Sequence, residues 1–403
     1  MRHLVKLLFP LLATVLAGCA KIDLGYRVTD NSTQAVTVIF YAEAFNNLSS
    51  DIKANIETTF KGSVPQKGSK KNLVVYAHCA KGDADATPVN GYLVKATRGE
   101  YGVLDLDTLL VVPSGESSVD PAVMRRVLNT AMEKAPAKEY GLILSSHGSG
   151  WLPQNYERFG DRALTRSIGA EGYFGRSGDD VAEMDIKTLA GAIPMHLSWM
   201  IFDACFMGCI EVAYELRDLV DKIGFSPTEI LSYGFDYTSL APYLLADGGS
   251  IERYCDSFYH RYADGGMGSG QMQSATITTV DCSQLDALSE LCATLFEKYR
   301  VPISRLRASD GIQRCYRPST DNYRYLFDME DILVHAGINA AEKLALEDAL
   351  SKCITYKANT PYFLELPIDT YCGLSMYLPG SGTTLLSNYY KSLSWNASTA
   401  LVE

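Results

Sequence analysis

Two short hydrophobic runs, each followed at once by small and polar residues, constrain the fold of this chain most strongly. Residues 142–144 lead into a Ser-Ser-His-Gly turn that contains His147, and residues 199–202 lead into an Asp-Ala-Cys block that ends at Cys205. Near-continuous apolar runs of this kind are typical of strands buried on both faces of a parallel sheet. The carboxyl ends of such strands meet at one edge of the sheet, where functional sites collect. We therefore expect His147 and Cys205 to lie close together.

A thiol and an imidazole at one sheet edge indicate a cysteine hydrolase. The thiol attacks as a thiolate, and a nearby imidazole can take its proton and later give a proton to a leaving amine. Each residue alone has an ordinary structural interpretation, because a single histidine or a cysteine in an apolar block is usually inert. Two rival pairings are weaker. His78 and Cys79 are neighbours on one strand and point to opposite faces, and Cys205 with Cys209 lacks the second pair that a zinc site needs.

The blocks around these two residues resemble a known family. The strand-flanked His-Gly and Ala-Cys blocks resemble those of the caspase–gingipain clan, and FDACFMGCIEVAYELRD followed by GFSPTEILSYGFDY is similar to the clostripain-like peptidases, family C11. The similarity runs from about Val36 to Tyr243 and includes Asn46-Asn47-Leu48, which resembles the family's asparagine-rich turn. It implies an α/β fold with a caspase-like, doubly wound, mostly parallel sheet flanked by helices.

The resemblance also implies roles for individual residues. Cys205 matches the nucleophile and His147 the general base, while the backbone N–H groups of Gly148 and Cys205 match the clan's oxyanion donors. Asp203 matches an aspartate associated with cleavage after Arg or Lys, because a carboxylate in a pocket pairs with a basic side chain. Asp203 has a second interpretation as the cap of a helix that we expect to open near Phe206, with its positive dipole end beside the sulfur. No third acidic member is evident, so we predict a dyad with His147 oriented by backbone groups.

The interval between the two motifs is a candidate for self-processing. Residues 151–183 are rich in glycine and arginine and show little periodicity. Related enzymes are made as single chains and cut themselves in this interval. The resemblance therefore predicts self-cleavage after one of four arginines, namely Arg158, Arg162, Arg166 and Arg176.

The N-terminus has the pattern of a bacterial lipoprotein signal. Residues 1–19 combine a basic start, a short apolar stretch and a small-residue end, and residues 16–19 match the lipobox in which Cys19 is lipidated. A membrane-spanning helix is the alternative, but the apolar run is shorter than the roughly 20 residues a bilayer needs and contains Pro10. We expect an exported protein, anchored by lipid to a bacterial membrane on the periplasmic side or at the cell surface, with a flexible tether over residues 20–33.

Composition restricts the partners. A formal net charge of −11 over 403 residues argues against nucleic acid and is compatible with basic peptide substrates. We expect a monomer that needs no cofactor or metal. Calcium dependence occurs in some relatives, but the chain has no compact Asp/Asn/Gly loop that predicts a site. The competing interpretation is a non-catalytic surface lipoprotein that binds peptide or glycan on the same fold, against which the intact Cys205 and His147 argue.

Local patterns predict a catalytic domain over residues 34–246 and a C-terminal helical or α+β subdomain over residues 247–403. Helix starts are signalled by Asp120-Pro121 and by Asp185. A late segment, CGLSMYLP, either extends the central sheet or forms a small sheet of its own. The cysteines other than Cys19 and Cys205 show no regular spacing, so few or no essential disulfides are expected. The strand candidates of the catalytic domain are 34–42, 72–78, 91–96, 140–146, 198–203 and 221–226, and the longer C-terminal helices are expected around 249–262, 284–299 and 340–354.

Overall fold

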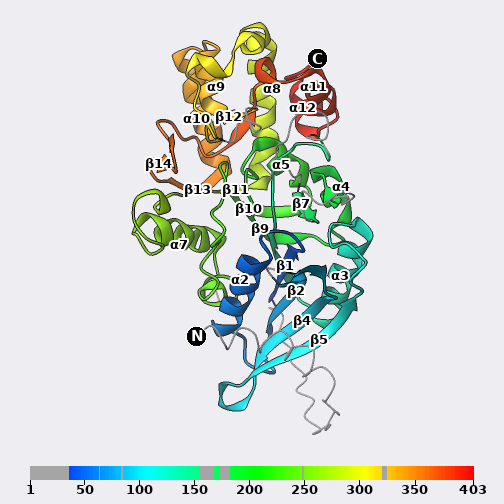
Figure 1. The fold of residues 1–403 in the computed structure, drawn as a ribbon. Coiled ribbons are helices and arrows are strands. Elements are labelled where there is room, and N and C mark those ends of the chain that lie inside the picture. Colours follow the sequence, from blue (N-terminus) through cyan, green and yellow to red (C-terminus); the bar gives the residue numbers. More distant parts are fainter. Residues whose placement is uncertain are drawn as a thin grey trace.

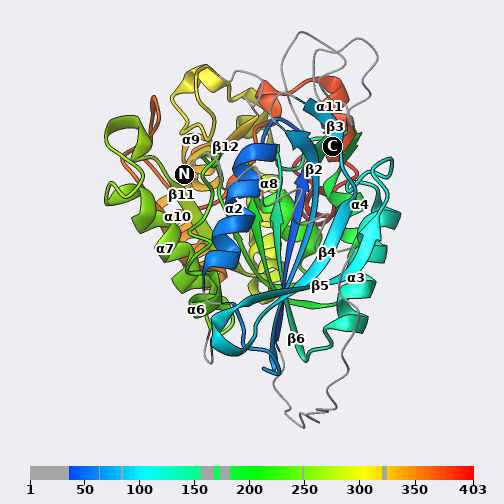
Figure 2. The same ribbon diagram turned by 60° about the horizontal axis from the view of Figure 1, so that its bottom comes forward.

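A large sheet forms the centre of the molecule (Figures 1 and 2). The computed structural model describes residues 36–62, 64–82, 85–154, 156, 168–172, 182–246, 249–319 and 325–403. Within these residues the sheet has ten strands in the order β13-β11-β10-β9-β6-β1-β2-β4-β5, with β3 paired to β2. The strands are β1 (Val36–Ala44), β2 (Lys71–Gly82), β3 (Asp85–Pro88), β4 (Gly91–Arg98), β5 (Leu104–Val112), β6 (Glu139–Ser145), β9 (Leu197–Asp203), β10 (Val220–Phe225), β11 (Thr276–Asp281) and β13 (Ile354–Asn359).

The middle of the sheet is parallel and its flanks are antiparallel. Strands β10, β9, β6, β1 and β2 pair in parallel, whereas β4 and β5 on one side and β11 and β13 on the other pair antiparallel. The six strand candidates correspond to β1, β2, β4, β6, β9 and β10, with boundaries that differ by a few residues. The predicted fold class, a mostly parallel α/β sheet flanked by helices, is confirmed.

Helices cover both faces of the sheet, which explains why its central strands β1, β6 and β9 are largely apolar. Ile39 and Tyr41 of β1 pack into one hydrophobic cluster, and Val38 and Phe40 pack into the other. The second cluster lies under α2, α6 and α7, and the first under the other helices (Figures 1 and 2). The helices are α2 (Ser49–Lys61), α3 (Pro121–Lys134), α4 (Ile186–Ala192), α5 (Ile210–Leu216), α6 (Leu240–Leu244), α7 (Ile251–Ala263), α8 (Leu285–Arg305), α9 (Met329–His335), α10 (Ala340–Cys353), α11 (Thr384–Tyr390) and α12 (Ser394–Thr399).

Two helix starts follow directly from capping residues in the sequence. The Asp120 side chain accepts a hydrogen bond from the Ala122 N–H, and Pro121 is the first residue of α3. The Asp185 side chain accepts one from the Thr188 N–H at the start of α4. Both predicted starts are confirmed, because an aspartate cap satisfies an N–H group that a helix otherwise leaves unpaired.

The C-terminal part shares the sheet and the core of the catalytic part. Strands β11 and β13 continue the central sheet beyond β10, and one hydrophobic cluster contains Phe202, Leu288 and Met376 together. The late segment forms a small sheet of its own, because its strand pairs with β12 and not with the central sheet. The small two-stranded sheets are β12 (Leu326–Asp328) with β16 (Ser375–Tyr377), β14 (Tyr362–Phe363) with β15 (Leu366–Pro367), and β7 (Ile168–Glu171) with β8 (Ala182–Met184).

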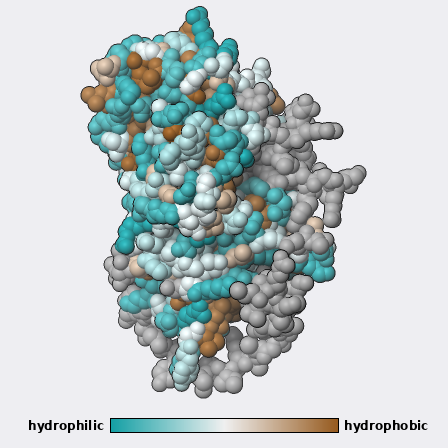
Figure 3. Space-filling model, turned by 60° about the vertical axis from the view of Figure 1, so that its left-hand side comes forward, coloured by the Kyte–Doolittle hydropathy of each residue, from teal (hydrophilic) through white to brown (hydrophobic). Residues whose placement is uncertain are grey.

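The exterior mixes polar and apolar residues. On the face shown in Figure 3, hydrophilic residues predominate and hydrophobic ones are interspersed in small groups. Val301, Leu344 and Tyr362 are among the large apolar side chains that are exposed, which is ordinary for a globular protein. Among the helices that the structure describes, none combines the length and the apolar character needed to cross a membrane.

Candidate active site

The register of two neighbouring strands brings the predicted catalytic turns together. Strands β6 and β9 pair in parallel, with Ser145 opposite Asp203 at their carboxyl ends. The Ser146 N–H also donates a 3.3 Å hydrogen bond to the Asp203 carbonyl. His147 and Cys205 each follow two residues beyond the paired ends, so both leave the sheet at the same edge.

Gly148 is the point at which the two turns touch. A Cβ atom placed on Gly148 would lie 2.5 Å from the Cys205 carbonyl oxygen and 3.0 Å from the Met207 sulfur. Real Cβ atoms do not come that close to backbone, so a side chain here would push the turns apart. The glycine therefore permits the close approach that the predicted oxyanion site at Gly148 and Cys205 requires.

The imidazole of His147 contacts the side chain of Asn47, which lies in the turn after β1. His147 is half-buried, and its Nε2 lies 3.1 Å from the Asn47 Oδ1. The turn itself is held by Asn46, whose Oδ1 accepts a hydrogen bond from the Leu48 N–H. With Nε2–H donating to the amide oxygen, the lone pair that a base needs is on Nδ1. The predicted orientation by backbone groups stays a prediction, and the asparagine-rich turn adds an amide side chain beside the imidazole.

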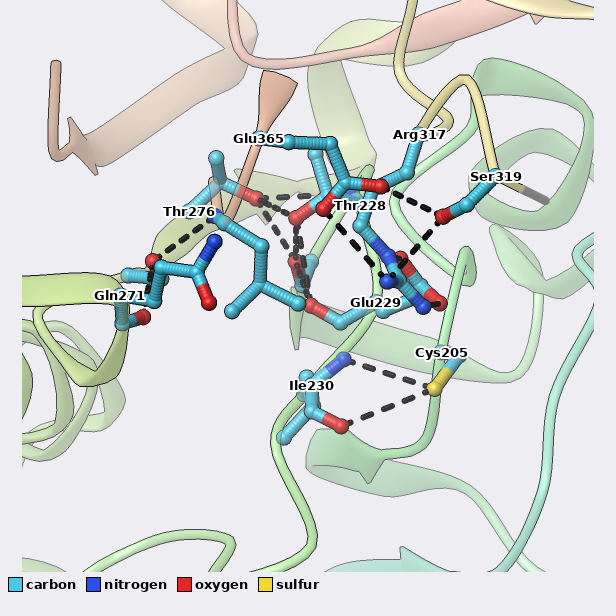
Figure 4. Close-up of polar contacts among 12 residues, drawn as sticks. Cys205, Thr228, Glu229, Ile230, Gln271, Thr276, Arg317, Ser319 and Glu365 are labelled. Atoms are coloured by element: carbon cyan, nitrogen blue, oxygen red, sulfur yellow. Dashed lines mark hydrogen bonds and ion pairs between the residues drawn. The ribbon is translucent and has the colours of Figure 1, made fainter. Parts of the chain in front are cut away.

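The sulfur of Cys205 is held by the backbone of Ile230 (Figure 4). The Ile230 N–H lies 3.4 Å from the sulfur, and the thiol lies 3.7 Å from the Ile230 carbonyl oxygen. Burial raises the pKa of Cys205 to about 12, and the nearby Glu229 carboxylate raises it as well. A thiol whose pKa is raised in this way is neutral near pH 7.

The predicted helix near Phe206 is wrong. Helix α5 begins only at Ile210, and Phe206 has a φ of 62°, outside the helical region. The reason is that two of the intervening residues, Phe206 and Gly208, bond to the chain after β10. The Phe206 N–H donates to the Thr228 carbonyl at 2.8 Å, and the Gly208 N–H donates to the Ser226 carbonyl at 2.7 Å. The predicted placement of a helix N-terminus directly after Cys205 is therefore not found, because α5 starts five residues later.

Asp203 is a buried carboxyl and does not cap a helix. It is 7% exposed. The Tyr237 hydroxyl donates to its Oδ2 at 2.6 Å, and the Ser145 hydroxyl donates to the same oxygen at 3.3 Å. A Cβ on Gly234, whose φ is 58°, would lie 2.6 Å from that oxygen, so the loop approaches closely. Burial raises the pKa of Asp203 to about 6, against the lowering effect of the Tyr237 and Ser145 hydrogen bonds.

The substitution Asp203→Asn is expected to change how stability depends on pH. The pKa of Asp203 is about 6 in the folded chain against an ordinary value of 3.8, so between pH 4 and 6 the folded state holds a proton that the unfolded state has lost. The free energy of unfolding of the wild type therefore falls as pH rises through this window, by about 3 kcal/mol in total. Asparagine does not titrate, so urea unfolding at several pH values should show the variant gaining that amount relative to the wild type. Parallel pH curves for the two proteins would contradict the prediction.

Metal and disulfide chemistry have no visible basis in the part of the chain that the structure describes. No group of three or more His, Cys, Asp or Glu side chains there could hold a metal ion. The nine described cysteines are all unpaired, and they are Cys79, Cys205, Cys209, Cys255, Cys282, Cys292, Cys315, Cys353 and Cys372. His78, the rival histidine, is buried and contacts the Glu171 carboxylate at 2.7 Å through Nδ1.

Five predicted residues lie outside the described residues. They are the lipidation candidate and the self-cleavage candidates, namely Cys19, Arg158, Arg162, Arg166 and Arg176. Conversely, the structure places Glu229 and Arg317 near the sulfur, and neither was predicted. Glu229 lies within the second block that carries the family resemblance, GFSPTEILSYGFDY. Its place in that block was a signal by which the sequence could have identified it. Arg317 had no such signal, because it lies far along the chain in the part where the resemblance is loose.

A cysteine and a histidine beyond adjacent parallel strand ends are the arrangement expected of a cysteine peptidase. Residues 41–362 match the sequence profile of Peptidase_C11, the clostripain family. The chain belongs to this family.

Named relatives agree with this assignment. Clostripain of Hathewaya histolytica is 24% identical over 243 residues, which is 55% of this chain and 44% of that protein, so the match spans less than half of the relative. The structure of an inactive zymogen C11 protease from Parabacteroides distasonis is similar with a TM-score of 0.74 and 26% identity, covering 91% of this chain and 99% of that one. A secreted C11 cysteine protease from Bacteroides thetaiotaomicron shares the fold, with a TM-score of 0.74, 22% identity and the same coverage.

Proposed function

We propose that this chain is an endopeptidase that cleaves peptide bonds after Arg or Lys with Cys205 and His147. The observation that carries the proposal is the parallel pairing of β6 with β9, which sends both residues to the same edge of the sheet. Membership of the clostripain family supports the reaction type. The contact of Gly148 with the Cys205 carbonyl supports an oxyanion site between the two turns.

The reaction follows from the chemistry of these groups. His147 takes the thiol proton of Cys205, and the thiolate attacks the scissile carbonyl carbon to form a tetrahedral oxyanion. The backbone N–H groups of Gly148 and Cys205 donate to that oxyanion. The carbon–nitrogen bond breaks as the imidazolium returns its proton to the leaving amine, which leaves a thioester. Water, deprotonated by His147, then hydrolyses the thioester and restores the thiol.

Asp203 is proposed to select the basic side chain. Asp203 is two residues before the nucleophile in sequence, and its carboxyl group is buried with two hydroxyl donors. A guanidinium or ammonium group that reached it would pair with a carboxylate in a poorly solvated site, while a neutral side chain would leave the charge unpaired. The exclusion of the capping role by the late start of α5 supports this assignment.

Self-processing is proposed because the thiol of the uncut chain is poorly activated and a similar protease is a zymogen. Burial and Glu229 hold the pKa of Cys205 at about 12, and a similar solved structure is an inactive zymogen. We expect purified wild type to be cut during prolonged incubation between the two motifs, after Arg158, Arg162, Arg166 or Arg176, while Cys205→Ala stays a single chain. Denaturing gels and mass spectrometry of the new termini measure this. Identical single bands for both proteins would contradict self-processing.

An arginyl chloromethylketone tests the peptidase proposal directly. The reagent should add one adduct to Cys205 of the processed wild type, and a neutral analogue with leucine in place of arginine should react much more slowly. A fluorogenic peptide library that varies only the residue before the cut gives the preference independently. Absence of labelling together with absence of hydrolysis would favour the alternative, a surface lipoprotein that binds peptide or glycan without cleaving it.

We also propose that the chain is exported and anchored by lipid at Cys19. The support is the signal-like sequence over residues 1–19, and one structural relative is described as a secreted protease. The mass of the N-terminal peptide of the mature protein, isolated from bacterial membranes, decides the point. A diacylglyceryl adduct on an N-terminal Cys19 is expected, and a mature N-terminus at any other residue would contradict it.

A further inference from the structure

An arginine from the C-terminal part forms an ion pair beside the catalytic thiol (Figure 4). Arg317 lies between α8 and β12, and Glu229 follows β10. The Arg317 Nε donates to one Glu229 carboxylate oxygen at 2.5 Å, and the Nη2 donates to the other at 2.7 Å. The two side chains are 23% and 16% exposed. A bidentate pair that is this well shielded has a defined geometry and is weakly screened by water.

Two further side chains, those of Ser319 and Glu365, contact the Arg317 guanidinium. The Arg317 Nη1 lies 3.4 Å from the Ser319 hydroxyl and 3.6 Å from a Glu365 carboxylate oxygen. The Ser319 hydroxyl donates to the other oxygen of Glu365 at 2.5 Å. Glu365 connects β14 and β15, so segments that are remote in sequence converge on one guanidinium group (Figure 4). The position of Arg317 is therefore set by the C-terminal part.

The ion pair is joined to the nucleophile through one short segment. Glu229 immediately precedes Ile230, whose N–H and carbonyl both contact the Cys205 sulfur. The Glu229 carbonyl in turn accepts hydrogen bonds from the hydroxyls of Thr228 at 3.2 Å and Ser226 at 3.4 Å. An interaction that restrains the Glu229 side chain therefore also restrains the Ile230 backbone, which contacts the sulfur.

Groups around the sulfur shift the pKa of Cys205 in opposite directions. Apart from burial, the carboxylates of Glu229 and Asp203 raise the pKa of Cys205, whereas the Ile230 N–H and the Arg317 guanidinium lower it. His147 approaches from the end of β6. Arg317 is the cation that offsets Glu229, which is the carboxylate with the larger effect.

We propose that Arg317 is a positioning residue for Cys205: by clamping Glu229, it fixes the 228–230 segment against the sulfur and neutralises the carboxylate that would otherwise oppose thiolate formation. The inference rests on the proposed function, because it assumes that Cys205 is the nucleophile. It extends that function by making a residue of the C-terminal part necessary for the reactivity of a thiol in the catalytic part.

The proposal is tested by two variants, one that removes the positive charge of Arg317 and one that removes the negative charge of Glu229. Below the thiol pKa, the rate of alkylation of Cys205 by iodoacetamide is proportional to the thiolate fraction, so one unit of pKa change is about a tenfold change in rate. We expect Arg317→Gln to slow alkylation of Cys205 about tenfold, Glu229→Gln to accelerate it by a similar factor, and the double variant to lie between them. Arg317→Lys should restore part of the rate. Mass spectrometry of the Cys205 peptide over a pH series separates this thiol from the other cysteines.

Arg314→Gln is the matched control. This arginine lies three residues away, and its guanidinium donates to the Ala308 carbonyl. It should leave the alkylation profile unchanged. If Arg317→Gln and Glu229→Gln moved the rate in the same direction, or by no more than Arg314→Gln, the pair would be only structural and the proposal would be overturned.

Kinetics separate this inference from the proposed function. With a fluorogenic arginyl peptide, Arg317→Gln should lower kcat about tenfold and change KM little, because the arginine acts on the sulfur and not on substrate binding. A loss confined to KM would overturn the proposal. If the two variants shift the alkylation rate in opposite directions but the wild type hydrolyses no peptide, the proposed function is refuted and the coupling between Arg317 and Cys205 stands.

Discussion

Replacing Cys205 with alanine is expected to abolish peptide hydrolysis, lowering kcat by at least about 10⁴-fold. Alanine removes the only atom at this position that can form the thioester, and the oxyanion donors and the imidazole cannot act without it. The measurement is the release of a fluorophore from an arginyl peptide by processed wild type, with the variant cleaved at the same site by a small amount of wild-type enzyme that is then inactivated.

Cys209→Ala is the matched control for this experiment. Cys209 lies four residues further along, is fully buried, and has a pKa raised well above its ordinary value by burial. Its loss should cost stability through a small cavity but leave kcat within a few fold. Near-ultraviolet circular dichroism shows whether both variants are folded. If a folded Cys205→Ala variant kept a substantial rate, the nucleophile would have to be another group and the proposed mechanism would fail.

Replacing Asp203 with asparagine is expected to have the second-largest effect, lowering kcat/KM for arginyl and lysyl peptides by about 10²–10³-fold. The amide keeps the size of the carboxyl group and an oxygen that the Tyr237 hydroxyl can reach, but it offers no charge to a buried cation. Because the Asp203 carboxylate raises the pKa of Cys205, alkylation of Cys205 by a small neutral reagent should be as fast as in the wild type or somewhat faster, and not slower. The measurement compares both reactions on the same samples.

Asp236→Asn distinguishes Asp203 from a neighbouring acid. Asp236 is about a third exposed, accepts hydrogen bonds from Thr238, and lies 3.6 Å from the Arg261 guanidinium. Its replacement should change kcat/KM by no more than a few fold. If Asp236→Asn lost the basic preference while Asp203→Asn kept it, the selecting carboxylate would be Asp236, and the position two residues before the nucleophile would be structural.

The parts of the fold that could be predicted are those with signals inside one segment. The apolar runs of β6 and β9 indicate strands because a strand buried on both faces tolerates few polar residues. The starts of α3 and α4 could be located because Asp120 and Asp185 satisfy helix N–H groups from within the same turn. The placement of His147 and Cys205 beyond the same edge of the sheet followed from these local facts plus the rule that functional groups gather at the carboxyl ends of parallel strands.

The mistakes and omissions occur where a distant segment competes with a local preference. The sequence after Cys205 favours an early helix, but Phe206 and Gly208 bond to the chain after β10 and delay α5 to Ile210. Likewise, the pairing of Arg317 with Glu229 depends on how the C-terminal part packs, and no pattern in the sequence predicts this ion pair. Asn47 was recognised as part of a turn, but its contact with His147 required the two turns to be placed in space.

The amino-acid sequence by itself determined the α/β class, six strands of the central sheet and the candidate reactive pair, because periodicity, caps and motif blocks act over a few residues. The tertiary structure alone decided the state of the thiol, the burial of Asp203 and the placement of Arg317. The physical reason is that pKa values and ion-pair geometry depend on desolvation and on charges within a few ångströms, and those neighbours come from segments far apart in the chain.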